Sequence, residues 1–125
     1  MIALVIDDSH TMRRIVRRIV AQLGFDVYEA ENGKEAIDLL AELPTVPAVA
    51  LVDWNMPVMD GLEFIRQVRQ LPDLRGMTIM MVTTEGEHSA IVRALAAGAH
   101  EYVIKPFPPE AIREKLALLG LVLAA

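Results

Sequence analysis

Five polar side chains, each placed directly after an apolar segment, could together bind a phosphoryl group. Asp7 and Asp8 are adjacent, while Asp53, Thr83 and Lys105 follow later segments. Neighbouring carboxylates repel one another unless a cation joins them, and oxygen-only ligands favour a hard ion such as Mg²⁺. A lysine and a hydroxyl opposite that ion would suit a phosphoryl group, and an aspartate can itself form an aspartyl phosphate. Without a cation, mutual repulsion should raise the pKa of these acids.

Some of these residues have a simpler explanation. Asp8 and Ser9 precede a helical pattern and could do no more than cap its first turn, and Asp53 taken alone could be a turn residue. Helix capping does not explain why Thr83 and Lys105 also stand at the ends of apolar segments. We therefore keep capping as the alternative for Asp8 and Ser9, and favour a metal and phosphoryl site for the group.

The order of apolar patterns predicts elements that would bring these side chains together. Short apolar or alternating runs predict strands, the second of them at a sheet edge, at residues 2–6, 25–30, 48–52, 78–82 and 101–104. Apolar residues recurring every three or four positions predict helices near residues 12–23, 32–43, 60–71, 89–97 and 108–120. This alternation predicts an α/β fold, a doubly wound (βα)5 parallel sheet with helices on both faces. Such sheets bind ligands at the C-terminal ends of their strands, where the five polar side chains are expected.

Composition limits the class of protein. The chain has 125 residues, 54% of them hydrophobic, which is enough for one domain over residues 1–125. Its net charge of −5 argues against nucleic acid as a direct partner. The absence of cysteine excludes disulfides and zinc–thiolate sites. No apolar run approaches the length of a membrane span, and Met1 leads directly into a predicted strand, so we expect a cytoplasmic domain.

Several other residues receive structural interpretations. Asp60, three positions before Glu63, is expected to cap the third helix, and Trp54 could either line the site or pack in the core. The three histidines lack the spacing of metal ligands, and the apolar tail at 119–125 could pack on the last helix or mark a removed output domain. A solvated face is the expected role of the arginines on the first helix, Arg13, Arg14, Arg17 and Arg18.

The chain resembles bacterial response-regulator receiver domains over nearly its full length. The segments that carry the resemblance are "VIDDS" with "MRRIV", "LVDWNMPVMDG", "MMVTTEG" and "YVIKPF", in the order and spacing of that family. The segments "DWNMPVMDG" and "MRRIV" are most similar to the stand-alone chemotaxis receivers. The resemblance implies a flavodoxin-like fold with strand order 2-1-3-4-5, and a cis peptide bond between Lys105 and Pro106.

The resemblance also implies a role for each matching residue. Asp53 would accept the phosphoryl group, with Thr83 and Lys105 contacting its oxygens. Tyr102 would be a rotameric switch that moves with Thr83, and Glu85 would tune hydrolysis of the acyl phosphate together with Asn55. Magnesium would be held by Asp7, Asp8, Asp53 and the backbone carbonyl of Asn55. One departure is Thr84, where chemotaxis receivers commonly have alanine, and this leaves the rate of hydrolysis open.

The implied function is that of a phosphoacceptor signalling module in a two-component system. A histidine kinase or histidine phosphotransfer domain would supply the phosphoryl group, and the domain would catalyse only its own phosphorylation and dephosphorylation. The product would bind a downstream protein, with a flagellar motor switch as one candidate and chemotaxis or motility control as the expected setting. We expect a monomer that contacts neither membrane nor nucleic acid. The expected partner face includes Ile91, Tyr102 and Ile104, while Leu95 beside them is expected in the core.

Three alternatives stay open. A relay intermediate or a severed receiver of a larger regulator would carry the same site. A magnesium-dependent phosphatase of the haloacid dehalogenase type would need a second acid two residues after its nucleophile, where this chain has Asn55, and it usually has a cap domain. A flavodoxin-like electron carrier would need a hydroxyl-rich phosphate loop after its first strand, where Asp7 and Asp8 would repel a phosphate.

Overall fold

The computed structural model describes residues 1–123 and contains the predicted parallel sheet. The strand order β2-β1-β3-β4-β5 confirms the expected flavodoxin-like topology, with β2 at one edge. All four neighbouring pairs are parallel. The strands are β1 (Ile2–Ile6), β2 (Asp26–Ala30), β3 (Val49–Val52), β4 (Thr78–Thr83) and β5 (Glu101–Ile104).

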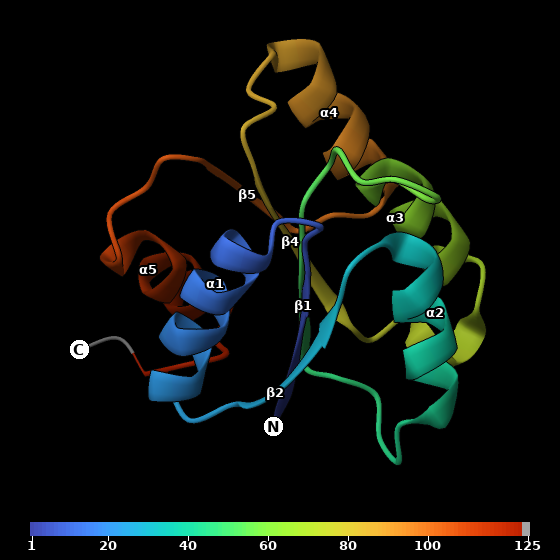
Figure 1. Cartoon of the computed structure of the whole chain (residues 1–125), viewed down its shortest axis with the longest axis horizontal. Helices are drawn as coiled ribbons and strands as arrows, with labels where there is room; N and C mark the ends of the chain where they lie inside the picture. Colours follow the sequence, from blue (N-terminus) through green and yellow to red (C-terminus); the bar gives the residue numbers. More distant parts are fainter. Residues whose placement is uncertain (124–125) are drawn as a thin grey trace.

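Helices cover both faces of the sheet, as the alternation of patterns predicts (Figure 1). Helices α1 (His10–Gln22) and α5 (Glu110–Leu118) lie together on one face. Helices α2 (Gly33–Glu42), α3 (Gly61–Arg69) and α4 (His88–Ala97) lie on the other side. A short 3₁₀ helix over Pro72–Leu74, which the sequence did not predict, leads into β4.

Alternate residues of the central strands serve two separate cores, which is why these strands read as unbroken apolar runs. Leu4 and Ile6 of β1 pack in the core beneath α2, α3 and α4, while Ala3 and Val5 pack beneath α1 and α5. Successive side chains of a strand point to opposite faces, so a strand buried on both sides needs apolar residues at every position. The sheet is therefore a rigid support for groups at its C-terminal edge.

Side-chain caps start three of the helices at the expected places. Ser9 accepts a hydrogen bond from the Met12 amide at 3.2 Å, and Asn32 accepts one from the amide three residues on at 2.9 Å. Asp60 accepts from the Glu63 amide at 2.9 Å, which confirms its expected capping role. These bonds satisfy amides that have no partner inside the helix.

Two interpretations of α1 and α4 were wrong. Arg13 is not part of a solvated stripe: it is only 8% exposed, and it shares the inner face of α1 with Val16 and Val20. Leu95, expected in the core, is 44% exposed on α4. Helical spacing explains both, because Arg13 stands three and seven residues before the buried valines, whereas the buried residues of α4 are the small Ala90 and Ala94.

The apolar tail packs against the protein as far as it is described. Leu119, Leu121 and Val122 contact the core formed with α1 and α5, which confirms the packing interpretation for that part of the tail. Residues 124–125 lie outside the described residues. Among residues 1–123, no helix is both long and apolar enough to cross a membrane.

Candidate phosphoacceptor site

The register of the sheet brings the predicted polar residues to one edge. Ile6 pairs with Val52, so the residues that follow, Asp7 and Asp53, leave the sheet side by side, and the Asp53 amide donates to the Ile6 carbonyl at 2.9 Å. On the other side, the Lys105 amide donates to the carbonyl of the last β4 residue at 2.8 Å. Strands 1, 3, 4 and 5 therefore end around one pocket, as their parallel arrangement requires.

The three acids form a cluster of the size that a cation can join. Each of Asp7, Asp8 and Asp53 offers a carboxylate oxygen, and these oxygens all lie within 4.8 Å of one another. Asp7 and Asp53 are buried, at 3% and 8% exposed, while Asp8 is exposed. The cap of α1 comes from Ser9, and Asp7 Oδ1 accepts the Ser9 amide at 2.9 Å. Helix capping therefore accounts for Ser9 but not for Asp8, whose carboxylate belongs to the acid cluster.

Lys105 joins the acids from the opposite side. Its Nζ lies 2.8 Å from Oδ2 of Asp7 and 3.8 Å from Oδ2 of Asp53. Both side chains of the shorter pair are almost completely buried, at 9% and 5% exposed for Lys105 and Asp7. A buried ammonium therefore compensates part of the charge of these acids, a contribution that the expectation of mutual repulsion did not include.

The pKa of Asp53 is raised from its ordinary value, but repulsion is not the main cause. Burial contributes most, followed by the charge of Asp7, while the Thr83 side chain, the Lys105 charge and the amide of Trp54 act in the opposite direction. Burial penalises the charged form of an acid. An additional positive charge nearby would therefore stabilise the ionised form of Asp53.

The chain after β3 holds Asp53 in place. The Trp54 amide donates to Asp53 Oδ1 at 2.8 Å, and the Gly61 amide at the start of α3 donates to the Trp54 carbonyl at 2.8 Å. A Cβ on Gly61 would stand 2.3 Å from the Asp53 carbonyl oxygen, so only glycine fits. Trp54 itself is buried in the core beneath α3 and α4, with Arg93 of α4 at 5.5 Å from its ring centroid. Of its two predicted roles, packing is the one observed.

The structure connects Thr83 to Tyr102 through the chain between them. Thr83 is fully buried, and its Oγ1 accepts the Glu85 amide at 3.2 Å. The Tyr102 hydroxyl donates to the Glu85 carbonyl at 2.6 Å. Burial, with the charges of Glu85 and Asp53, raises the pKa of Tyr102 to about 12, so this hydroxyl stays protonated and remains a donor. A displacement of Thr83 would therefore change the position of the Glu85 backbone to which the Tyr102 hydroxyl is bonded.

An open cavity of about 700 Å³ gives access to the acids. Asn55 and Thr84 line it and are exposed. The sequence analysis missed its apolar lining, which comes from α1 and from the segment after β5, namely Met12, Ile15, Pro106 and Phe107. The peptide bond between Lys105 and Pro106 is cis, as predicted.

The other missed residue is Arg13, whose buried guanidinium contacts the backbone beside the acids. Its Nη1 donates to the Asp7 carbonyl at 2.9 Å. The three- and four-residue spacing that places Arg13 on the inner face of α1 was the available signal, but a charged residue is not usually assigned to a core face.

Carboxylate oxygens are the ligands that Mg²⁺ prefers, and two or three of them in a partly open pocket leave room for the waters that this ion retains. The acid cluster of this chain fits that requirement. Receiver domains in general bind Mg²⁺ at such a pocket.

The fold and this pocket define a response-regulator receiver domain. The family model described as "Response regulator receiver domain" matches residues 3–117, and the chain belongs to that family. Within the family it is a receiver of the CheY type, the type of the chemotaxis response regulators.

Individual relatives support this assignment. The chain is 49% identical over 114 residues to a chemotaxis protein CheY homolog of Campylobacter jejuni subsp. jejuni, covering 90% of this chain and 87% of that protein. It is 43% identical over 117 residues to chemotaxis protein CheY1 of Helicobacter pylori, covering 93% and 94%. Among solved structures, chemotaxis protein CheY4 of Vibrio cholerae superposes with a TM-score of 0.85 at 33% identity, covering 93% of this chain and 95% of that one.

Proposed function

We propose that this receiver accepts a phosphoryl group on Asp53 and thereby changes its affinity for a downstream protein. The observation that carries the proposal is the position of Asp53 in the acid cluster with Asp7 and Asp8, within reach of Lys105. Its Oδ1 is engaged by the Trp54 amide at 2.8 Å, whereas its Oδ2 faces Lys105 Nζ at 3.8 Å. Oδ2 is therefore the oxygen available as the nucleophile.

The donor in this proposal is the phosphohistidine of a histidine kinase or a histidine phosphotransfer domain. Oδ2 of Asp53 attacks phosphorus, the P–N bond breaks, and its electron pair leaves with the imidazole nitrogen, which takes up a proton. Lys105 and the Thr83 hydroxyl donate to the phosphoryl oxygens. Mg²⁺, when held by Asp7, Asp8, Asp53 and the Asn55 carbonyl, would neutralise charge on those oxygens. The domain turns over no other substrate.

The remaining site residues receive their roles as part of this proposal. Asn55, which lines the cavity, and Glu85, whose amide donates to Thr83, tune hydrolysis of the acyl phosphate. Thr84 places a hydroxyl and a branched carbon in the cavity, where it influences access of water. The domain acts as a monomer in the cytoplasm, over residues 1–125, in the control of chemotaxis or motility.

The output in this proposal is a partner face made by α4, β5 and α5, with Ile91, Tyr102 and Ile104 on it. Ile104 is 40% exposed and Leu95 is 44% exposed, so both side chains are accessible to a partner. Tyr102 links this face to Thr83 through the bonds at Glu85. A flagellar motor switch protein is one candidate for the downstream target, and a relay intermediate would use the same site with a different recipient.

Phosphorylation of Asp53 is tested by incubating the protein with acetyl phosphate and Mg²⁺ and recording its intact mass. We expect the parent to gain one phosphoryl group and Asp53→Asn to gain none. Asp60→Asn is the matched control, because asparagine is an equally good helix cap and Asp60 lies in the same loop. If Asp53→Asn gains phosphate as the parent does, the proposed acceptor is wrong. Continuous release of phosphate from a phosphomonoester would instead indicate a phosphatase.

A further inference from the structure

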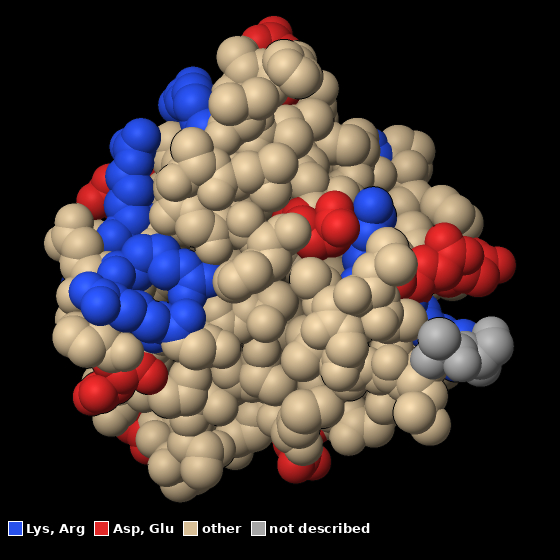
Figure 2. Space-filling view, turned by 180° about the vertical axis from the view of Figure 1, so that it is seen from behind, with Lys and Arg blue, Asp and Glu red and all other residues tan. Residues whose placement is uncertain are grey.

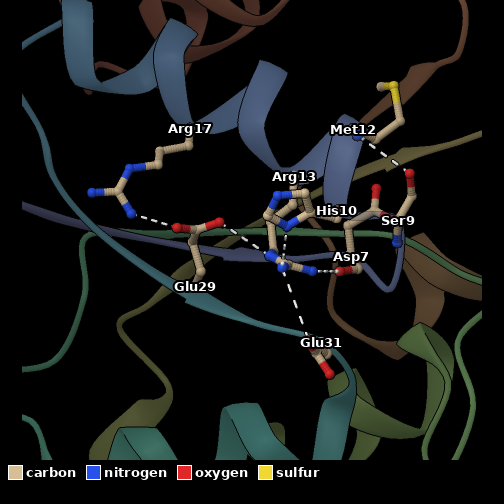
Figure 3. A network of polar contacts seen from close by, with 8 residues as sticks. All are labelled: Asp7, Ser9, His10, Met12, Arg13, Arg17, Glu29 and Glu31. Carbon is tan, nitrogen blue, oxygen red and sulfur yellow. Dashed lines mark hydrogen bonds and ion pairs between the residues drawn. The ribbon is translucent and has the colours of Figure 1, made fainter.

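The guanidinium of Arg13 connects the acid loop, residues 7–9, to the edge strand β2 (Figure 3). Arg13 Nη1 donates to the Asp7 carbonyl at 2.9 Å, and Nε donates to Oε1 of Glu29 at 3.0 Å. Its Nη2 lies 3.2 Å from Nδ1 of His10. A charged side chain that is only 8% exposed is costly to bury unless such partners satisfy it.

Glu29 is the residue that compensates the buried charge. It accepts from Arg13 and from Arg17 (Figure 3), and its side chain is 26% exposed. Burial raises the pKa of Glu29, but the hydrogen bonds and positive charges of Arg17 and Arg13 together hold that pKa below its ordinary value. Glu29 is therefore ionised at neutral pH. Glu31 adds a longer contact at 4.0 Å to Arg13.

Arg13 holds the backbone carbonyl of Asp7, a group that neither the sheet nor the other site residues hold. The Asp7 amide donates to the Ala30 carbonyl at 3.1 Å, which continues the pairing of β1 with β2. Its two carboxylate oxygens are engaged by the Ser9 amide and by Lys105. The carbonyl, where the chain turns out of the sheet toward α1, is held by Arg13. The direction of the Asp7 side chain depends on that peptide unit.

We infer that Arg13, oriented by Glu29, is a positioning residue that keeps Asp7 in the geometry of a metal ligand. The inference rests on the proposed magnesium site. Charge and position have opposite effects here, which makes the inference testable. A guanidinium near the pocket repels a cation, so losing only its charge would strengthen Mg²⁺ binding. Losing its hold on Asp7 would weaken Mg²⁺ binding, and outer-shell partners of metal ligands typically contribute 10–100-fold in affinity.

The experiment is a calorimetric titration of MgCl₂ into the parent and three variants at 25 °C and constant ionic strength. Arg13→Ala should raise the Kd about 10-fold, at the low end of the range for outer-shell partners. Glu29→Ala, which leaves Arg13 in place but removes the carboxylate that accepts from it, should raise it by a smaller factor. Arg14→Ala is the matched control, because it removes the same charge from the same turn, and Arg14 is exposed with no side-chain hydrogen bond or ion pair within residues 1–123. We expect its Kd to stay within about twofold of the parent value.

A Kd for Arg13→Ala equal to that of the parent, or lower, would overturn the inference while leaving the magnesium site intact. A parent protein that binds no Mg²⁺ would overturn the proposed site and this inference together. Thermal melts in EDTA establish which variants are folded at the titration temperature. If Arg13→Ala is not folded, the test rests on Glu29→Ala, because a merely structural role for the network predicts a lower melting temperature with an unchanged Kd.

Discussion

Lys105 and Asp7 form the most buried ion pair described in this protein, and each depends on the other. Removal of one partner from a buried pair typically costs about 3–5 kcal/mol, because the remaining charge is left without compensation. We expect Lys105→Ala to lower the free energy of unfolding in EDTA by about 3 kcal/mol, or about 10 °C in melting temperature. Saturating Mg²⁺ should stabilise this variant more than it stabilises the parent, since a cation can replace the missing ammonium.

The control for Lys105→Ala is Lys34→Ala, which breaks a surface pair. Lys34 Nζ lies 2.8 Å from Asp38, but both side chains are more than half exposed. Surface pairs contribute about 0–1 kcal/mol, so this variant should melt close to the parent and respond to Mg²⁺ as the parent does. Equal melting temperatures of Lys105→Ala and the parent in EDTA would contradict the buried role of the pair.

Val58, in the loop after Asp53, has a backbone conformation that its side chain disfavours. Its φ is +69°, and it is the one residue other than glycine with positive φ within residues 1–123. The left-handed region costs a typical residue roughly 1–2 kcal/mol, whereas asparagine tolerates it. Val58 is 82% exposed, so little packing would be lost. We expect Val58→Asn to raise stability by about 1 kcal/mol in urea unfolding.

Val46 provides the comparison for Val58→Asn. It is also exposed in a loop, at 43%, but without positive φ. Val46→Asn should not stabilise the protein, so an equal gain in both variants would show that backbone strain is not the cause.

His100, between α4 and β5, should make the free energy of unfolding depend on pH. Its Nδ1 accepts the Ile79 amide of β4 at 3.1 Å. Burial, followed by the positive charge of Arg69, holds the pKa of His100 below its usual range. The unfolded chain therefore takes up a proton at higher pH than the folded chain does, and the free energy of unfolding should fall as the pH drops below about 6.5.

His100→Asn should remove this part of the pH dependence, because the Asn carbonyl can still accept the Ile79 amide but does not titrate. The measurement is urea unfolding of parent and variant at pH 7.5, 6.5 and 5.5. The difference in stability between the two proteins should shift in favour of the variant as the pH falls. A difference that is constant with pH would mean that His100 binds protons equally in both states.

At the scale of elements, apolar periodicity was enough to predict every strand and every α-helix within residues 1–123 to within a few residues. The prediction worked because β1, β3 and β4 are buried on both faces and because Asn32 and Asp60 act as caps. It did not predict the 3₁₀ helix over Pro72–Leu74, which is too short to show a periodic pattern of apolar residues. The strand order came from the resemblance, since local patterns do not encode which strands are neighbours.

The candidate site was predictable as a set of residues but not as a set of contacts. Strand ends identified Asp53 and Lys105, whereas the preference of Lys105 for Asp7 over Asp53 depends on side-chain geometry. The buried position of Arg13 was missed, because a charged residue is normally assigned to the solvent side of a helix. The packing of Trp54 under Arg93 was equally hidden, because it joins residues on different elements.

At the scale of the whole molecule, charged groups are unevenly distributed over the surface. The face turned away from the viewer of Figure 1 has its largest group of basic side chains on the left, while smaller basic groups lie near acidic side chains on the right (Figure 2). The proposed partner face carries the exposed apolar side chains Leu95 and Ile104.

We expect phosphorylation to change that face at a distance from the acids. The link from Thr83 through Glu85 to Tyr102 gives a physical route. In amide NMR spectra recorded before and after addition of acetyl phosphate with Mg²⁺, signals of Ile91, Leu95 and Ile104 should shift. Tyr102→Phe, which removes the hydroxyl donor, should reduce these shifts while leaving those at Asp53 in place. Shifts confined to the immediate neighbours of Asp53 would count against the proposed output.

The bond between Lys105 and Asp7 spans 98 positions of the chain, and this separation has a consequence for biosynthesis. Contacts between distant residues are slow to form, because the intervening chain must first be ordered. A nascent chain that ends after β4 already contains the three acids and Thr83, but it lacks the ammonium that compensates them. The incomplete polypeptide on the ribosome is therefore unable to assemble the pocket. Under the proposed function, we therefore expect competence to accept a phosphoryl group only once β5 and Lys105 have been translated and β5 has joined the edge of the sheet.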